Sequence, residues 1–220
     1  MTAYKLNLPL TEADVTKLKI GDMVYLTGPV FTCRSMLQKK VLEEGEKMTV
    51  DPQKYNVLFH TGPIMKDCGN GQWQMMSFMP TSTIRFEKWT PLAIEKWGLR
   101  MILGKTSVGP ASTEVMKKLK CVHIVPQSVS PNDWVDCIRV EGVDRIEEMG
   151  KTEATWKLYC TNLGPFVVDV DCEGHHLFDL NLDNIKRNVK KAYAKLGIPE
   201  DLQYTKLYGL PDAEDTTERS

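Results

Sequence analysis

Three short segments between residues 101 and 125 restrict the possible fold more than any other feature of the sequence. Residues 101–105 and 121–125 are apolar runs typical of buried strands, and residues 112–119 between them have the spacing of a helix. Ser112 or Thr113 is the expected N-cap of that helix. A strand, a helix and a strand in such short order favour parallel or mixed pairing, because parallel neighbours need a crossover connection. The sequence therefore predicts an α/β domain with a mixed sheet.

The remaining elements follow from capping, periodicity and turn residues. Thr11 and Asp14 form a capping-box pattern that opens a short helix after an extended start. Two strands are expected to end at Gly-Pro corners, Gly28-Pro29 and Gly62-Pro63. Pro91 either kinks a helix that starts near Thr81 or lies in the first turn of a second helix. We further expect strands at 22–27, 56–60 and 136–143, helices at 36–44 and 182–196, loops at 66–74 and 127–135, a hairpin of 156–160 with 166–171, and a disordered end at 212–220.

Length and charge restrict the class of protein. The 220 residues suit one domain with appendages, which we divide into an N-terminal arm (1–20), a main domain (21–180), and a C-terminal helix and flexible tail (181–220). The 28 basic and 29 acidic residues give a net charge of −1, so we expect neither nucleic acid nor an anionic membrane as a partner. No apolar run approaches the roughly 20 residues that span a bilayer, and no secretory signal is visible, so the cytoplasm is the expected compartment.

Six cysteines are spread along the chain without the short spacings of zinc or iron–sulfur motifs. We expect mostly reduced thiols, with Cys121 and Cys160 in the core because they lie in apolar strand-like runs. Cys33 precedes Arg34 in a candidate site segment. His60 and His123 lie in predicted strands and are expected to be core or edge residues rather than metal ligands.

The segment 79–85 is the strongest candidate for chemistry. It places Thr81, Ser82 and Thr83 directly after Pro80 and within five residues of Arg85. One interpretation is an ordinary helix N-terminus capped by a hydroxyl. The other uses the same geometry, because hydroxyls and unpaired N–H groups at a helix start, with an arginine one turn in, can hold a carboxylate or phosphate.

Arg34, Thr81, Arg85 and Lys105 share one situation, since each lies where a predicted strand or loop passes into the next element. Sites in open α/β sheets gather at such ends. Two arginines and a lysine around hydroxyls suit a small dicarboxylate, because arginine binds carboxylates bidentately and lysine adds a point charge. The alternative is that each is an ordinary surface cation.

The chain resembles the β subunit, equivalently the C-terminal domain, of class I iron–sulfur fumarases and L-tartrate dehydratases. The resemblance rests on an ordered set of motifs from about Gly21 to Phe178 rather than on one motif. The motifs stand here as Gly21-Asp22, Arg34-Ser35-Met36-Leu37-Gln38, Gly62-Pro63, residues 79–86 (Met-Pro-Thr-Ser-Thr-Ile-Arg-Phe), Gly104-Lys105-Thr106 and Glu153-Ala154-Thr155-Trp156.

This resemblance implies a swivelling β/β/α-type domain, a hydro-lyase β-type catalytic domain at 21–180, that closes over a [4Fe–4S] cluster carried by a separate α subunit. It implies a carbon–oxygen lyase that is active only with this α subunit, in a heterotetramer of two α and two β chains. Fumarate and malate are the favoured substrates, and tartrate, converted to oxaloacetate, comes second. The resemblance further implies that Thr81 takes part in proton transfer, assisted by an aspartate of the α subunit because a threonine hydroxyl is a poor base. It implies that Arg34, Arg85 and Lys105 hold the carboxylates, and we count Thr83 with these substrate-binding residues.

Four positions depart from the family pattern. Ser35 and Gln38 replace an aspartate and a histidine, Met79 replaces a glycine, and Thr106 replaces another glycine. The cations are kept, which favours a dicarboxylate substrate. The departures also leave room for an alternative from another class, a non-catalytic or regulatory interaction subunit that retains the fold and the anion pocket.

Overall fold

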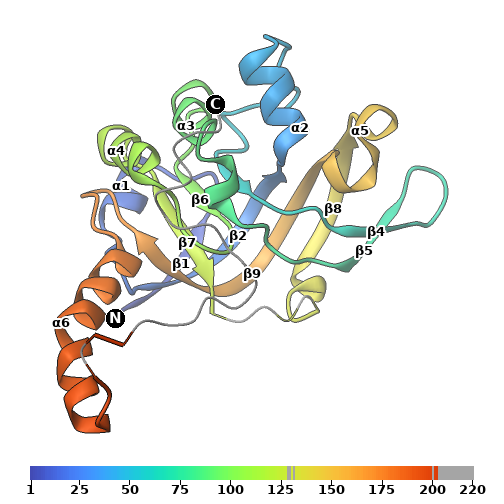
Figure 1. Cartoon of the computed structure of the whole chain (residues 1–220). Coiled ribbons are helices and arrows are strands. Elements are labelled where there is room, and N and C mark those ends of the chain that lie inside the picture. The colour runs from blue at the N-terminus through green and yellow to red at the C-terminus, as the bar shows by residue number, and fades with distance from the viewer. Residues whose placement is uncertain (128–129, 131, 200, 203–220) are drawn as a thin grey trace. The chain divides into compact units, whose positions relative to one another are not determined.

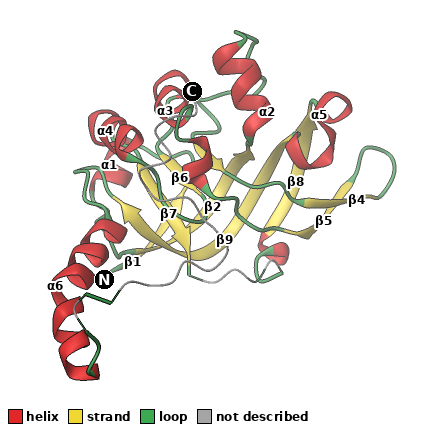
Figure 2. Ribbon diagram, viewed as in Figure 1, coloured by secondary structure: helices red, strands yellow, loops and turns green. Residues whose placement is uncertain are grey.

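The computed structural model describes residues 1–127, 130, 132–199 and 201–202. Its contacts divide the chain into two compact units, Met1–Phe178 and Asp179–Ser220. The first unit is a mixed α/β structure with a seven-stranded sheet and a separate two-stranded hairpin (Figures 1 and 2). The predicted disordered end at 212–220 lies outside the described residues, as do parts of the predicted loop at 127–135.

The large sheet is mixed, as the sequence predicts. Its order is β1 (Ala3–Asn7), β2 (Met23–Thr32), β3 (Val57–Phe59), β6 (Met101–Leu103), β7 (Val122–Pro126), β9 (Thr155–Val170) and β8 (Ile138–Asp144). The first five are parallel to their neighbours, whereas β9 runs antiparallel to β7, β8 and β2. Because β9 pairs with β2 as well as β7, the strands β2, β3, β6, β7 and β9 form a closed ring of pairings. The N-terminal segment belongs to this sheet through β1.

Alternating side chains of the central strands contribute to two hydrophobic clusters. In β3, Val57 and Phe59 belong to one cluster, which is built mostly from the ring strands, and Leu58 belongs to the other. The second cluster packs the sheet against helices through residues such as Leu37, Ile94 and Met116. Strands that are buried on both faces have continuous apolar sequences, and such strands are therefore easily recognised in the sequence.

Helices and short turns connect the strands of the first unit. The capping box of α1 is present as predicted, and Pro91 lies in the first turn of α3 rather than at a kink. The helical segments are α1 (Glu12–Thr16), α2 (Ser35–Gln38) with the π-helical turn η1 (Lys39–Glu43), the 3-10 turns η2 (Thr83–Phe86) and η3 (Val135–Cys137), α3 (Thr90–Trp97), α4 (Pro110–Leu119) and α5 (Ile146–Glu153). A last helix, α6 (Leu177–Leu196), begins five residues before the predicted start. Among the described residues, no helix is long and apolar enough to cross a membrane.

The predicted end of the first strand at Gly28-Pro29 is wrong, because β2 continues to Thr32. Gly28 has φ +133°, and a Cβ there would lie 2.8 Å from the Cβ of Leu8. The glycine therefore allows a neighbouring segment to cross closely within the strand, which is a common reason for glycine inside a strand.

The predicted hairpin of 156–160 with 166–171 is also wrong. Thr155–Val170 is one strand, and Gly164-Pro165 lies within it. A Cβ on Gly164, at φ +146°, would lie 2.6 Å from the carbonyl oxygen of Val24 in β2. The glycine thus marks a close backbone approach and an irregular register with β2, not a reversal of the chain.

Two further segments differ from expectation. Residues 66–74, expected as a loop, belong to a hairpin of β4 (Ile64–Asp67) and β5 (Trp73–Ser77), whose tight turn alone carries the glycines. The helix expected near Thr81 is only the short turn η2, which begins at Thr83. In addition, α4 begins at Pro110 with Gly109 as its N-cap, in place of Ser112 or Thr113.

Candidate active site

The candidate site lies at the carboxyl ends of three parallel strands. Arg34 follows β2 and occupies the N-cap of α2, as the predicted strand-to-helix junction requires. His60 follows β3, and Lys105 follows β6. Because these strands are parallel and adjacent, their carboxyl ends share one edge of the sheet.

Thr81 is held between two of these ends by its backbone. Its N–H donates to the carbonyl oxygen of His60 at 2.5 Å, and its own carbonyl oxygen accepts from the N–H of Lys105 at 3.1 Å. The N–H of Thr83 donates to the carbonyl oxygen of Lys105 at 2.9 Å. Residues 81–83 therefore continue the sheet as an inserted extended segment, which fixes the Thr81 backbone relative to Lys105.

Arg34 is oriented by Glu153, a residue of α5. The guanidinium Nε lies 3.4 Å from Glu153 Oε1, and the other carboxylate oxygen accepts from the N–H of Met36 at 3.0 Å and from the Ser35 hydroxyl at 3.4 Å. A Cβ on Gly62 would lie 2.7 Å from Nη1 of Arg34, so the guanidinium passes directly over this glycine. Glu153 belongs to the motif Glu153-Ala154-Thr155-Trp156 that was recognised in the sequence, but only the tertiary structure shows that it contacts Arg34.

Arg85 and Lys105 keep their charges available. Arg85 is exposed at the end of η2, and Lys105 is partly buried. Within the described part of the chain, no carboxylate lies within 4.0 Å of either side-chain cation. Cations without a carboxylate partner, next to hydroxyls at a sheet edge, provide a positive site that suits an anion.

Thr83 lies beneath this edge and is fully buried. Its hydroxyl oxygen is 3.3 Å from Nδ1 of His60 and 2.9 Å from Nε2 of His123, and Nδ1 of His123 is 2.6 Å from Oδ1 of Asp169. The prediction that both histidines are core residues is confirmed. Burial, with a smaller effect of nearby His123, lowers the pKa of His60 to about 3, so the His60 imidazole is neutral at physiological pH.

Sequence reasoning missed this buried set because its members are far apart along the chain. A polar residue inside an apolar strand was the available signal, and both His123 and Asp169 show it.

Cys33, buried near Gln38, remains a protonated thiol because burial raises its pKa well above the ordinary value. Cys121 and Cys160 are buried, as predicted.

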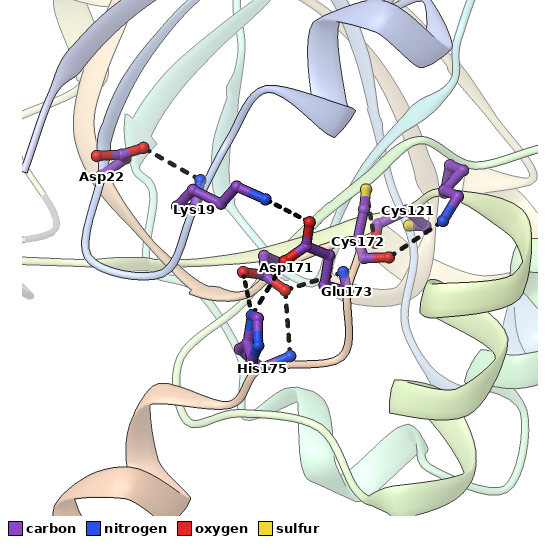
Figure 3. Close-up of polar contacts among 8 residues, drawn as sticks. Lys19, Asp22, Cys121, Asp171, Cys172, Glu173 and His175 are labelled. Carbon is purple, nitrogen blue, oxygen red and sulfur yellow. Dashed lines mark hydrogen bonds and ion pairs between the residues drawn. The ribbon is translucent and has the colours of Figure 1, made fainter.

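Among the described residues, one group of three metal-ligand-type side chains is present, and it follows β9 (Figure 3). It consists of Asp171, Glu173 and His175. Asp171 Oδ1 accepts from the N–H groups of Glu173 at 2.9 Å and His175 at 3.1 Å, and Oδ2 lies 3.0 Å from Nδ1 of His175. Glu173 pairs with Lys19 at 2.6 Å. These contacts stabilise a turn and account for the group.

Together, the fold and the site define an α/β domain that presents cations and a hydroxyl at the carboxyl edge of parallel strands. A family model described as the fumarase C-terminus matches residues 1–181. The chain belongs to this family, and the resemblance inferred from the motifs is confirmed.

Curated relatives agree with this family. The chain is 29% identical over 179 residues to the L(+)-tartrate dehydratase subunit beta of Escherichia coli (strain K12), covering 80% of this chain and 87% of the relative. It is 31% identical over 203 residues to a putative L(+)-tartrate dehydratase subunit beta of Methanocaldococcus jannaschii, covering 85% and 93%. A putative fumarate hydratase class I of Geobacillus stearothermophilus is 30% identical over 175 residues, which are 79% of this chain and 33% of that protein.

Proposed function

We propose that this chain is the β subunit of a two-subunit iron–sulfur hydro-lyase that reversibly hydrates or dehydrates a small dicarboxylate. The observation that carries the proposal is the position of Thr81, held between the ends of β3 and β6 with Arg34 and Lys105 at the same edge. Membership of the fumarase C-terminus family and the names of the β-subunit relatives support it. Fumarate and malate are the first substrates to test, and tartrate is the second.

The side chains suit this chemistry. Removing a proton next to a carboxylate builds negative charge, and nearby cations stabilise that charge. We assign Arg34, Arg85 and Lys105 to the two carboxylates and Thr81 to proton transfer at the neighbouring carbon. Because a threonine hydroxyl is a poor base, Thr81 needs a stronger partner, for which we propose an aspartate of the α subunit.

We also propose that the [4Fe–4S] cluster is carried by the α subunit. In the described part of this chain, the group of clustered ligand-type side chains contains no cysteine, so the described residues present no set of thiolates that fits such a cluster. Lewis-acid activation of the substrate hydroxyl is the chemistry that such a cluster supplies from the partner. The swivelling β/β/α type of domain is a proposal supported by the closed ring of strand pairings, and the two-α, two-β stoichiometry and the cytoplasmic location remain predictions.

The test is anaerobic co-expression with the candidate α subunit, followed by an absorbance assay for double-bond loss or formation. Fumarate, malate and both tartrate enantiomers are the substrates. We expect turnover of one of them by the complex and none by either subunit alone. A stable, iron-replete complex that is inert with all of them would support the non-catalytic interaction subunit instead, which the changes at Ser35 and Gln38 favour.

Two substitutions test the assigned roles within the active complex. Thr81→Ala should abolish turnover with little loss of stability, and Arg85→Ala should raise KM because an exposed cation that binds substrate is lost. Lys118→Ala, which removes an exposed cation at the end of α4, is the matched control and should change neither parameter. Near-normal turnover by the Thr81→Ala complex would exclude the proposed role of Thr81.

A further inference from the structure

A continuous row of buried polar side chains lies beneath the candidate site. Gln38 Nε2 is 3.4 Å from Nε2 of His60, and His60 then contacts the Thr83 hydroxyl, which contacts His123. His123 contacts Asp169, whose second oxygen accepts from the Ser107 hydroxyl at 2.5 Å. Gln38, His60, Thr83, His123 and Asp169 are all at most 1% exposed. A buried row of this kind is costly where a polar atom is left unpaired, and among the described residues Gln38 Oε1 is the one atom of these five side chains without a hydrogen-bond partner.

The orientation of the Gln38 amide, with Nε2 toward His60, is consistent with one direction for the hydrogen bonds along this row. The amide nitrogen of Gln38 can only donate, so Nε2 of His60 accepts. Nδ1 of His60 then carries the proton and donates to the Thr83 oxygen, since the imidazole is neutral. In the same direction, the Thr83 hydroxyl donates to Nε2 of His123.

The row ends on a single carboxylate. His123, accepting at Nε2, carries its proton on Nδ1 and donates to Asp169. From the other side, the Ser107 hydroxyl donates to Asp169 and its oxygen lies 2.8 Å from Nε2 of His176. In this arrangement donors converge on Asp169 from both directions, and both internal histidines carry their proton on Nδ1.

We propose that His60, His123 and Asp169 are positioning residues that act on the site through Thr83. The Thr83 hydroxyl is the point where the row meets the site segment, because Thr83 is two residues from Thr81 and two from Arg85. The Thr83 N–H donates to the carbonyl oxygen of Lys105, and a Cβ on Gly104 would lie 1.9 Å from the Thr83 hydroxyl oxygen. Thr83 therefore lies directly against the end of β6. The inference rests on the proposed function. It assigns Thr83 a positioning role beneath the site in place of the direct substrate contact that the resemblance suggested.

The decisive substitutions change the hydroxyl and little else. Thr83→Val keeps the shape but leaves Nδ1–H of His60 without an acceptor and Nε2 of His123 without a donor. We expect kcat of the α–β complex to fall about tenfold to a hundredfold, the cost of small displacements of catalytic groups. Thr83→Ser restores the hydroxyl and should restore kcat. Thr155→Val is the matched control, because Thr155 is fully buried and its hydroxyl has no partner among the described residues.

A second measurement determines the protonation pattern of the histidines in the row and does not depend on enzyme activity. With the histidines of this chain labelled with 15N in the complex, NMR should show His60 and His123 protonated at Nδ1 in the unmodified chain. The Thr83→Val complex should lose this pattern, and the Thr83→Ser complex should keep it. The chain has four histidines, and exposed His175 serves as the internal reference.

The two measurements separate the possible failures. Nε2 protonation of either internal histidine in the unmodified chain, or an active Thr83→Val complex with unchanged kcat, overturns the inference. If the unmodified complex turns over no diacid, the proposed function fails, and the amide resonance of Thr81, measured with the threonines of this chain also labelled with 15N, then decides the positioning role. A shift of that resonance in Thr83→Val but not in Thr155→Val upholds positioning, and an unchanged resonance overturns it.

Discussion

Single residues decide how closely the segments of the site approach one another. Gly104 directly follows β6 and lies against the Thr83 side chain, and Gly62 lies under the Arg34 guanidinium. Neither glycine has the positive φ of a turn, so their role is to leave space. The sequence shows both glycines in motifs, but the neighbours that require them come from distant parts of the chain.

Gly104→Ala should therefore disturb the site more than its small volume suggests. The new methyl group would overlap the Thr83 hydroxyl, and overpacking of this kind costs about 1–3 kcal/mol. We expect a lower Tm together with a loss of hydro-lyase turnover. Gly142→Ala, at a strand position with no heavy atom within 4 Å, is the control, and equal effects of the two substitutions would contradict this account.

His60 gives the stability a pH dependence. Its pKa is about 3 in the folded chain, against 6.5 for an exposed histidine, so the unfolded chain binds more protons between these two values. Stability should therefore fall as the pH drops below about 6.5, by about 2 kcal/mol between pH 6.5 and 5. Urea unfolding at the two pH values measures this loss, and His60→Gln should reduce it by that amount. An undiminished loss in the variant would assign the dependence to other groups.

Among the elements, α4 takes its N-terminal cap from another part of the chain. Its N-cap, Gly109, has no side chain to accept from the helix, and the Glu87 carboxylate does so instead. It accepts from the N–H groups of Gly109 at 2.8 Å and Ser112 at 3.0 Å, and from the Ser112 hydroxyl at 2.6 Å. Glu87 immediately follows η2, so this cap ties α4 to the segment that carries Arg85.

Glu87→Gln should weaken this tie. The amide keeps one accepting oxygen but loses the charge and the second acceptor, and loss of a helix cap costs about 0.5–2 kcal/mol. The expected result is a lower free energy of unfolding, measured with urea at neutral pH. Glu114→Gln, on an exposed position of the same helix, should change it little. A Glu114→Gln effect as large as that of Glu87→Gln would argue against a specific cap.

At the scale of the whole molecule, the closed ring of strands holds the two hydrophobic clusters together. β9 pairs with β2, β7 and β8, and so joins segments from both ends of the first unit. The residues of both clusters, and every strand found among the described residues, fall within Met1–Phe178. α6 contributes no buried side chain to either cluster.

Removal of residues 179–220 should therefore leave the fold of the first unit intact. We expect the truncated chain to unfold cooperatively, with a Tm within about 4 °C of the full chain, the shift that corresponds to roughly 1 kcal/mol for a domain of this size. Differential scanning calorimetry compares the two chains directly. A non-cooperative transition would mean that the second unit is needed for folding.

The sequence by itself determined the α/β class with a mixed sheet, the central strands, the α1 capping box and the family. These are local properties, because apolar runs, caps and ordered motifs can be recognised along the chain without knowing what they contact. Tertiary structure alone decided that Gly28-Pro29 and Gly164-Pro165 lie inside strands, since glycine permits either a turn or a close approach and only the neighbouring backbone distinguishes them. It also decided that Thr83, His123 and Asp169 meet, because residues about forty positions apart become neighbours only when parallel strands and β9 close the ring.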